Sequence, residues 1–446
     1  MNAETDLRQL LKSGNPRDLR RRLSEIHPAD VADVIEGIDS SDEIHLLTLM
    51  AMLNDRQLAQ VLEHLNPSDQ LRVIEHMPQS RLQSVVQFVS PDELVDLLSL
   101  LDTATVRTLL NVLPDRNTIQ ELMQYPETSA GGIMTTDFIS FTGERQCGTA
   151  LNVYRRLAKE VDAAYYIYVT DLDGHLTGVI TLRELVLAEP TKTLAEIGRS
   201  DVVSVRSSED QEQVSNVLRH YDFLAIPVVD DDHHLLGVIT VDDVLDVIEQ
   251  ETSEDIHRMG GVEPSDEPYL QTSAWSFVKR RAVWLLALFA AQTLTGNILD
   301  YFQEYIQAVV ALAFFIPLLI DTGGNAGAQA ASTVIRAMAL GEVSLSDLGR
   351  VVWREMRSGV VLGAMMAGAA FIQASWIGGS TAIGYTVGGA LLIIVILGSM
   401  LGACLPLVVS IFRFDPAAAS APVVTTLVDS TGLIVYFMVA RWMLGL

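Results

Sequence analysis

The pattern of hydrophobic and polar positions divides the chain into two parts. Up to about residue 271, apolar residues alternate with polar ones at helix and strand periods. Beyond Lys279-Arg280-Arg281, long apolar runs follow one another, and residues 358–412 are 55 positions without a charge. One spanning helix needs only ~20 residues, so this run must fold back within the Gly/Ser/Thr-rich residues 375–385. Five membrane spans are predicted, at roughly 282–301, 306–335, 353–374, 385–411 and 419–443.

Residues 1–130 predict an acidic, all-α domain of short stacked helices. Leu94, Leu97, Leu98 and Leu101 have the i, i+3, i+4, i+7 spacing of one buried helix face. Helix starts recur as a proline followed by acids, an order that suits the first turn and the helix dipole. These starts are expected at Pro28, Pro67, Pro91 and Pro114.

Residues 131–250 change to a strand period and repeat themselves. Ile167 to Thr181 matches Ile226 to Thr240 at an offset of 59 residues without a gap. Each copy predicts a strand, a turn and a second strand, which together form a β-hairpin followed by a helix. The doubled hairpin resembles tandem CBS domains, which are paired α/β regulatory modules. The resemblance places the two domains at 131–195 and 196–250.

CBS domains often bind adenosine nucleotides, holding them through a hydroxyl and an acid that follow the second strand. The resemblance places this pair at Thr240 and Asp243, whereas Thr181-Leu-Arg183-Glu184 departs from the pattern. ATP or another adenosine nucleotide is therefore one candidate ligand. The alternative is that these acids cap helices or meet a cation.

Residues 242–271 predict an acidic connecting helix and a linker, overlapping the end of the second CBS domain. Val244, Leu245, Ile248 and Ile256 suggest one apolar stripe, and Gly260-Gly261 suggests its end. Seven carboxylates occupy fourteen residues from Asp242. Two interpretations stay open: a solvated acidic face, or a sensor for hard divalent ions such as Mg²⁺, which prefer oxygen ligands. The candidate sensor residues are Asp243, Asp246, Glu251, Glu254 and Asp255.

The charge is distributed unevenly between the two parts. The whole chain of 446 residues has a formal net charge of −26. From Thr272 onward there are 9 Lys/Arg and 8 Asp/Glu, whereas the first 271 residues hold 21 Lys/Arg against 48 Asp/Glu. Such an acidic region repels phosphates, which argues against nucleic acid as a partner, and it attracts cations.

The basic residues of the membrane part predict its orientation. They lie at Lys279 to Arg281, at Arg336 to Arg357 and at Arg413, in alternate connections. The other connections, 300–305 and 375–385, contain no Lys or Arg. By the positive-inside rule, the N-terminal part is cytoplasmic and the C-terminus lies outside. We expect a multi-pass protein in the lipid bilayer of the cell (inner) membrane.

Two carboxylates lie at membrane depth, Asp321 and Asp429. Thr425 and Thr426 precede Asp429 by four and three residues, so one helical face can present hydroxyls and a carboxylate together. An ionised carboxylate in a bilayer needs water, a cation or a basic partner. Every arginine of this part lies near a span end, so a cation is the expected partner.

The second span also carries a cluster of polar residues and glycines. Asp321 is followed by Asn325 within the run Gly323-Gly324-Asn325-Ala-Gly327-Ala-Gln329. Glycines there let helices approach closely or let the backbone unwind. Two roles for Asp321 stay open: it lines an ion path together with Asn325, or it caps a broken helix.

These features together resemble the MgtE family of magnesium transporters. The motifs that carry the resemblance are this glycine-rich run and Asp415-Pro416-Ala417, followed by Pro422, Thr426, Asp429 and Gly432. The resemblance implies a homodimeric, Mg²⁺-selective, channel-like transporter with Asp429 as the pore ligand. It also implies that Mg²⁺ binding to the cytoplasmic domains closes the pore. Ala328 and Ala330 depart from the family pattern, and Asp321 replaces a small residue of some relatives.

Other functions are less consistent with the residues. No ATPase signature appears in the sequence, and we expect passive transport and no enzymatic activity. An intramembrane aspartyl protease would need a Gly-x-Gly-Asp motif, but Asp321 precedes its glycines. A membrane-tethered nucleotide sensor would leave the polar residues of the spans without a use. Transport of Co²⁺ or Mn²⁺ stays open, because oxygen ligands discriminate weakly among such ions.

Overall fold

The structure is a computed structural model that divides into two compact units, Met1–Glu251 and Thr252–Leu446. Each unit is described by itself. The described residues are 7, 9–11, 16–39, 42–158, 161, 165–265, 269, 272–412 and 414–445. Arg413, one of the basic residues used to predict orientation, lies outside them.

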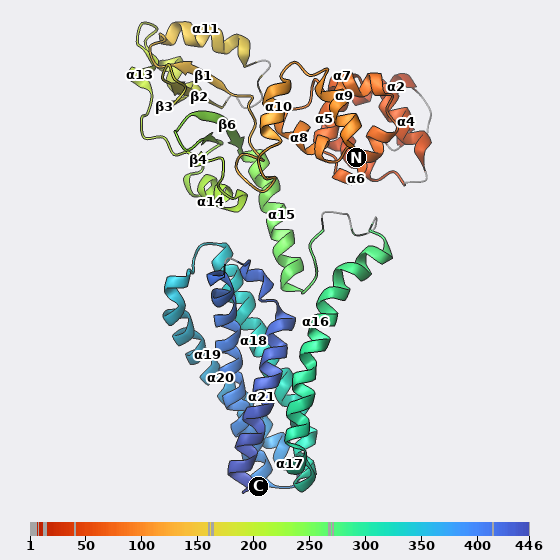
Figure 1. Cartoon of the computed structure of the whole chain (residues 1–446), viewed down its shortest axis with the longest axis vertical. Coiled ribbons are helices and arrows are strands. Elements are labelled where there is room, and N and C mark those ends of the chain that lie inside the picture. The colour runs from red at the N-terminus through yellow and green to blue at the C-terminus, as the bar shows by residue number, and fades with distance from the viewer. Residues whose placement is uncertain are drawn as a thin grey trace. The chain divides into compact units, whose positions relative to one another are not determined.

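The first unit begins with the predicted domain of short stacked helices (Figure 1). Pro28, Pro67 and Pro91 each open a helix, as the sequence predicts, and the side chains of His27 and Asn66 accept backbone N–H groups at two of these starts. The start predicted at Pro114 is wrong, because that helix begins at Arg116. The described helices are α2 (Pro16–Leu23), α3 (Pro28–Glu36), α4 (Glu43–Met52), α5 (Asp55–Glu63), α6 (Pro67–Glu75), α7 (Gln79–Val85), α8 (Pro91–Ser99), α9 (Thr103–Leu110) and α10 (Arg116–Leu122).

Apolar side chains on the inner faces of these helices form one core. Leu94, Leu97 and Leu98 of α8 are buried, as their spacing predicts. The same cluster continues into the second CBS domain through Ile226 and Ile239. The helical domain and the second CBS domain therefore share a hydrophobic core.

The two sequence repeats fold as two similar three-stranded sheets. In each sheet the first strand pairs in parallel with the second, and the second and third strands form the predicted antiparallel hairpin. The strands are β1 (Ile139–Thr142), β2 (Tyr166–Thr170), β3 (Leu176–Thr181), β4 (Val205–Arg206), β5 (Ala225–Val229) and β6 (Leu235–Thr240). The helices of this region are α11 (Cys147–Leu157), α12 (Leu182–Leu187), α13 (Leu194–Ile197) and α14 (Gln211–Tyr221).

The two hairpins meet at their turns. The Leu176 N–H donates to the His233 carbonyl at 3.0 Å, and the Leu235 N–H donates to the Gly174 carbonyl at 3.1 Å. The rings of His175 and His234 stack with their centroids 4.2 Å apart. These contacts join the two CBS domains into a pair.

The acidic connecting helix is α15 (Val241–Met259), which ends at the predicted Gly260-Gly261. Its predicted apolar stripe is only partly correct. Val244 and Val247 are buried, but Leu245 and Ile256 are exposed. Only the first turns of α15 pack against the core that includes the second CBS domain, and Val244 belongs to that core.

The second unit contains five helices long and apolar enough to cross a membrane, among the residues that the structure describes. They confirm the five predicted spans, although the first begins early enough to include Lys279 to Arg281. The long helices are α16 (Ala274–Tyr301), α18 (Ile316–Ala339), α19 (Leu348–Ile377), α20 (Thr381–Ile411) and α21 (Ala421–Leu444). Shorter elements are α17 (Gln303–Ala308), η1 (Val310–Phe315), η2 (Leu345–Asp347) and η3 (Pro416–Ala418).

Helix α20 forms the centre of this unit and contacts α18, α19 and α21 (Figure 1). Glycines make the close approach possible. A Cβ atom on Gly402 would overlap the carbonyl oxygen of Gly327, so these two backbones pack directly on each other. Helix α16 contacts α21, where the hydroxyls of Thr295 and Ser430 lie 3.1 Å apart.

Candidate ion pathway and cation-binding sites

The glycine-rich second span is a continuous helix, so of the two uses of its glycines that the sequence left open, unwinding does not occur. Helix α18 runs from Ile316 through all of its glycines to Ala339. The glycines serve close packing instead: Gly323 and Gly327 lie against Ile394 of α20 and Val424 of α21. Phe315 occupies the N-cap position, and Asp321 lies in the second turn of the helix. Asp321 therefore does not cap this helix, which removes one of its two expected roles.

The side of α18 away from these glycines carries a row of exposed polar residues. Asp321, Asn325 and Gln329 follow one another at four-residue spacing and are all exposed in the single chain. We call these three residues the polar stripe. Their spacing places them near one face of a helix that is long and apolar enough to cross a membrane.

Asp429 lies on α21, next to the polar stripe. A Cβ atom on Gly324 would lie 3.5 Å from Oδ1 of Asp429 and 3.1 Å from Cγ2 of Thr425. Asp429 is half-buried, and the negative charge of Asp321 acts on it electrostatically. The structure thus brings together the two membrane carboxylates that the sequence singled out. Two carboxylates that repel each other in a place of low polarity favour a bound cation.

The threonines beside Asp429 are oriented by their own helix. The hydroxyls of Thr425 and Thr426 donate to the Pro422 carbonyl at 3.0 and 2.8 Å. Because these hydrogen bonds use the hydroxyl protons, the oxygen lone pairs stay available to accept a hydrogen bond from a water molecule bound to a metal ion. Both threonines are therefore suited to accept hydrogen bonds from the water shell of an ion.

A second group of acids lies in the first unit, where the helical domain meets the second CBS domain. Asp92, Glu93 and Asp96 of α8 interact electrostatically with Asp243 at the start of α15. We call these four residues the acid cluster. The Oδ1 atom of Asp92 is buried and has no hydrogen-bond partner among the described residues.

Burial and mutual repulsion raise the pKa values of the acid cluster. Burial, opposed by hydrogen bonds, raises the pKa of Asp92 to about 6. Burial and then the charge of Asp92 raise the pKa of Glu93 to about 9 and that of Asp243 to about 7. Burial, followed by the charges of Glu127 and Asp243, raises the pKa of Asp96 to about 6. Such a cluster disfavours ionised carboxylates unless a cation joins them.

Sequence reasoning selected Asp243 but missed its partners on α8. Ser90-Pro91-Asp92-Glu93 was interpreted only as a helix start, since acids in the first turn suit the helix dipole. A signal was present, because Asp92 and Asp96 are like charges four residues apart on one helix face. Their approach to Asp243 is a tertiary contact that no local spacing shows.

The other candidate sensor residues lie in different surroundings along α15. Burial, then the charges of Glu249 and Asp242, raise the pKa of Asp246. The Gln211 side chain donates to Glu251 at 2.7 Å. Glu254 forms an ion pair with Arg258, and Asp255 is half-buried. The contacts of the five residues therefore differ along the helix, and their role as a sensor stays a prediction.

The end of α15 is tied to the start of α21 within the second unit. Arg258 forms an ion pair with Asp415, which also accepts the Ala417 N–H in η3 at 2.7 Å. A Cβ atom on Gly261 would lie 3.3 Å from Pro422, and the positive φ of +67° there favours glycine. The acidic helix thus contacts the segment that leads into the helix of Asp429.

The nucleotide candidates are bonded to each other. The Thr240 hydroxyl donates to Asp243 at 2.5 Å, and the Thr240 N–H donates to the same oxygen at 3.1 Å. In the first repeat, Thr181 and Glu184 form a capping box, which matches the capping alternative for that repeat. Asp243 thus belongs both to the nucleotide candidate and to the acid cluster.

A further group of oxygen and nitrogen ligands lies in the first hairpin turn. Ligand atoms of Asp171, Asp173 and His175 lie within 4.8 Å of one another. Asp171 already accepts the N–H groups of the other two residues at 3.0 and 2.9 Å. These bonds shape the turn, which explains the arrangement without an ion.

Comparisons with known proteins match the helical domain, both CBS domains and most of the membrane region. A divalent cation transporter family model (MgtE) matches residues 316–439, the MgtE intracellular N domain matches 26–128, and CBS domain models match 130–190 and 194–250. The magnesium transporter MgtE of Thermus thermophilus is 39% identical over 80% of each chain. The MgtE proteins of Enterococcus faecalis and Bacillus subtilis are 35% and 33% identical over 72% of this chain and 70% and 71% of theirs.

Solved structures extend this similarity to the cytosolic region. The cytosolic domain of the Mg²⁺ channel MgtE in complex with ATP has 36% sequence identity and a TM-score of 0.51, covering 55% of this chain and 99% of its own. The soluble part of a magnesium transporter has 32% identity and a TM-score of 0.50, over 56% of this chain and 98% of its own. The family models, the sequence identity to curated relatives and the five apolar helices all point to one family. The chain belongs to the MgtE family of magnesium transporters, which are not enzymes.

Proposed function

We propose that the chain forms a passive, channel-like and Mg²⁺-selective path across the cell membrane, with Asp429 as its pore ligand. The observation that carries this proposal is the polar stripe beside Asp429. Hydrocarbon cannot hydrogen-bond a carboxylate and two amides, so this face of α18 must meet water or protein. A water-filled path that runs along Asp321, Asn325 and Gln329 would provide these side chains with hydrogen-bond partners.

A second copy of the chain supplies the other wall of the path. The polar stripe is exposed in the single chain, and a homodimer would bury it at a twofold axis. Each protomer then contributes one Asp429 and one polar stripe to the same path. In the proposed topology the N-terminal part lies in the cytosol, and five helices long enough to cross the membrane would then leave the C-terminus outside.

The small number of carboxylate ligands in the proposed pore is suited to Mg²⁺. Mg²⁺ dehydrates reluctantly and is usually held by one or two carboxylates with several waters retained. Asp429 supplies the charge, while Thr425, Thr426 and Asn325 can accept hydrogen bonds from the waters of the ion. Transport is then driven by the concentration gradient and the membrane potential.

Closure by cytosolic Mg²⁺ is supported by the acid cluster. Without a cation, the members of the acid cluster that are ionised, Asp92 and Asp96 foremost since their pKa values are about 6, repel one another and loosen the contact between the helical domain and α15. A bound Mg²⁺ offsets this repulsion and tightens the contact. Helix α15 continues to Arg258 and Gly261, whose contacts with Asp415 and Pro422 pass the change to α21.

An adenosine nucleotide such as ATP is proposed as a modulator of this closure. A solved relative is a cytosolic domain in complex with ATP. In this chain Asp243 is both the partner of Thr240 and a member of the acid cluster. A nucleotide that engages Thr240 would therefore act on the same carboxylate as the regulatory cation.

Ion flux into liposomes that contain the purified full-length protein tests the transport proposal. Mg²⁺, Ca²⁺, Co²⁺ and Mn²⁺ are supplied one at a time, with and without ATP and with an imposed membrane potential. We expect Mg²⁺ flux that needs no ATP, follows the potential and exceeds the flux of the other ions. Equal flux of Mn²⁺ or Co²⁺, or flux that requires ATP hydrolysis, would contradict it.

A further inference from the structure

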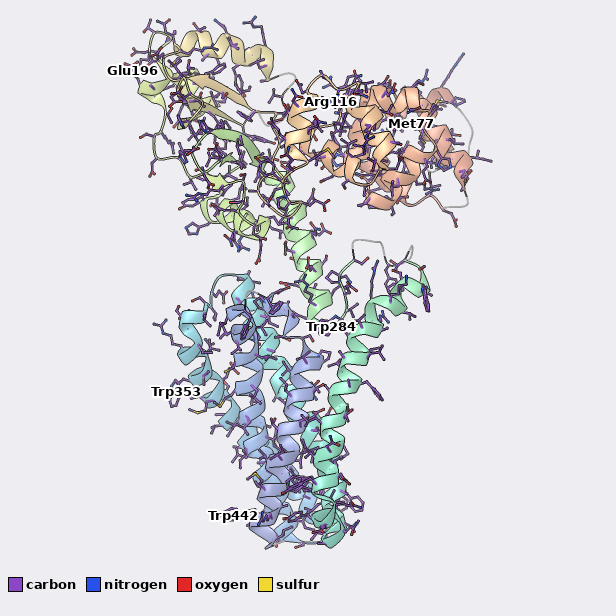
Figure 2. All side chains as sticks on the ribbon, in the orientation of Figure 1. Met77, Arg116, Glu196, Trp284, Trp353 and Trp442 are labelled. Carbon is purple, nitrogen blue, oxygen red and sulfur yellow. The ribbon has the colours of Figure 1, made fainter. Side chains whose placement is uncertain are left out.

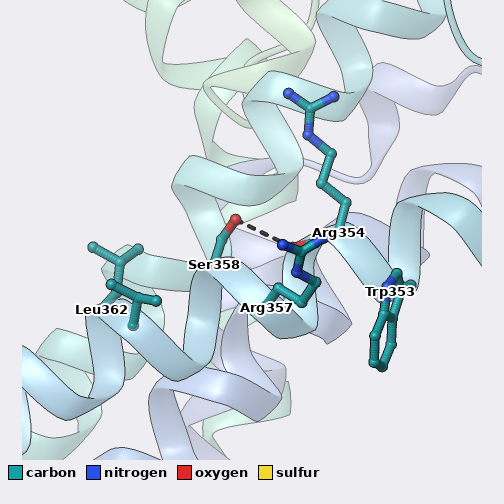
Figure 3. Close-up of a pocket in the computed structure, with 6 residues that line it drawn as sticks. Trp353, Arg354, Arg357, Ser358 and Leu362 are labelled. Carbon is teal, nitrogen blue, oxygen red and sulfur yellow. Dashed lines mark hydrogen bonds between the residues drawn. The ribbon is translucent and has the colours of Figure 1, made fainter.

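Helix α19 carries a basic hollow on its outer face, at the end where it enters the membrane. Trp353, Arg354, Arg357, Ser358, Val361 and Leu362 line an open hollow of about 790 Å³ (Figure 3). Their i, i+1, i+4, i+5 spacing places all six on one stripe of the helix. None of the six is buried by the rest of the chain.

The two arginines of this hollow are available to a ligand. Within the described part of the chain, neither Arg354 nor Arg357 has an acidic group within ion-pair distance, whereas Arg350 pairs with Asp347 at 2.8 Å. The Ser358 hydroxyl donates to the Arg354 carbonyl at 3.2 Å (Figure 3), so the donors left to a ligand are the two guanidinium groups and the indole N–H of Trp353. Two guanidinium groups on one stripe match the oxygen atoms of a phosphate group.

Beyond the arginines the same face becomes apolar. Val361 is 62% exposed, and the exposed residues from Val360 to Ile372 are all apolar. Trp353 is 58% exposed and Trp376 is 86% exposed. The helix rises about 34 Å between them at ~1.5 Å per residue, close to the ~30 Å hydrocarbon core of a bilayer.

These positions place the hollow at the lipid headgroups. Tryptophan is enriched at both membrane interfaces, so Trp353 and Trp376 mark the two levels. Figure 2 shows Trp353 projecting from the side of α19. The cytosolic domain precedes α16, and α16 and α18 are each long and apolar enough to cross once, which would bring the start of α19 to the cytosolic leaflet. Anionic lipids give that leaflet its negative potential.

We propose that the hollow is a binding site for an anionic glycerophospholipid of the cytosolic leaflet. Arg354 and Arg357 bind the headgroup phosphate, Trp353 lies at the level of the glycerol backbone, and an acyl chain lies along Val361 and Leu362. The polar stripe of α18 needs water or protein, whereas this face combines two cations with exposed residues that are apolar from Val360 to Ile372. That combination is complementary to an anionic lipid.

Quenching of Trp353 fluorescence by brominated lipid tests the site directly. The chain has five tryptophans, and replacing Trp275, Trp284, Trp376 and Trp442 by Phe leaves Trp353 as the reporter. The full-length variant is placed in mixed phosphatidylglycerol and phosphatidylcholine bilayers, with one or the other lipid brominated. Arg354→Gln/Arg357→Gln removes the site, and Arg336→Gln removes one exposed charge at the same membrane level from α18.

We expect brominated phosphatidylglycerol to quench Trp353 as if it were enriched roughly thirtyfold over its share, since each of the two arginines adds about one kcal/mol and each 1.4 kcal/mol is about tenfold. The double variant should lose this preference, and Arg336→Gln should keep it. Equal quenching by both lipids would overturn the proposal. Quenching by neither lipid would also overturn it, because it would mean that protein, such as a second copy, covers the face. Native mass spectrometry of the wild-type chain, in which retained phosphatidylglycerol is counted, gives the same comparison if the single-Trp variant does not fold.

Discussion

At the scale of single residues, Asp321 has lost one of the two roles that its sequence left open. It lies in the second turn of a continuous helix, five residues after the first. Its exposed side chain begins the polar stripe and acts electrostatically on Asp429. The role of Asp321 in the ion path stays a prediction.

The variant Asp321→Asn tests that role. We expect a several-fold lower Mg²⁺ flux or a weaker preference for Mg²⁺ over monovalent ions, because one negative charge is removed close to the ion. The charge-preserving Asp321→Glu should recover part of the flux. Both are measured in liposomes with a Mg²⁺-sensitive dye. Unchanged flux and selectivity in Asp321→Asn would remove Asp321 from the path.

At the scale of elements, the membrane helices could be predicted because their signal is local. Charge-free runs and basic ends gave all five spans, with errors confined to their limits. The glycines of the second span were ambiguous, since glycine permits both unwinding and close approach. Only the neighbours resolve this, because Gly323 and Gly327 lie against side chains from two other helices.

Because α18 and α20 approach closely at Gly402, we predict that one added methyl group there lowers the stability of the protein. Gly402→Ala would place a Cβ atom on the carbonyl oxygen of Gly327, with no flexible side chain to yield. We expect a loss of about 1–3 kcal/mol of stability or more, seen as a lower melting temperature in detergent. Gly389→Ala on the same helix is the control, because nothing lies within 4 Å of its Cβ position. Equal melting temperatures of the two variants would contradict this helix contact.

At the scale of the whole molecule, the regulatory residues were the least predictable. The sequence placed the sensor on one acidic helix, because seven carboxylates gather there. In the structure Asp243 interacts with three acids of α8, which lie far from it in the sequence and near it only in the folded chain. Glu251 accepts a hydrogen bond from Gln211 and Glu254 pairs with Arg258, contacts that local charge density does not show.

The acid cluster makes a prediction about inhibition by cytosolic Mg²⁺. Asp92→Asn/Asp243→Asn removes two of its carboxylates, so closure should need severalfold more Mg²⁺ while the open path still conducts. Moving a two-state gate across its range takes about 5.5 kcal/mol of differential binding free energy, so the loss of two ligands should weaken closure measurably. Flux is recorded while Mg²⁺ on the cytosolic side is stepped. The control Asp231→Asn/Asp232→Asn changes two exposed acids of a hairpin turn. An inhibition curve identical to wild type would place the sensor elsewhere.

The same cluster predicts a pH dependence in Mg²⁺-free buffer. Its raised pKa values, about 6 for Asp92 and about 7 for Asp243, favour the neutral acids in the folded state. Their stabilising contribution is fully present below the unfolded pKa of ~4 and is lost as pH rises through the folded values. Amide hydrogen exchange of α8 in the full-length protein should therefore become faster between about pH 4 and pH 7, after correction for the intrinsic rate. The effect should be smaller in Asp92→Asn/Asp243→Asn, and equal pH dependence in the two proteins would contradict it.

The central claim is that Mg²⁺ crosses the membrane beside Asp429. Its most direct test is Mg²⁺ flux through Asp429→Asn in liposomes, compared with Asp300→Asn, which removes an exposed carboxylate at the end of another span. A carboxylate about 5 Å from a divalent ion contributes several kcal/mol at an effective dielectric constant of about 20. We predict that Asp429→Asn lowers the flux more than about tenfold, since each 1.4 kcal/mol is about tenfold in affinity. Asp300→Asn should conduct like the wild type. Wild-type flux through a correctly folded and inserted Asp429→Asn protein would contradict the claim.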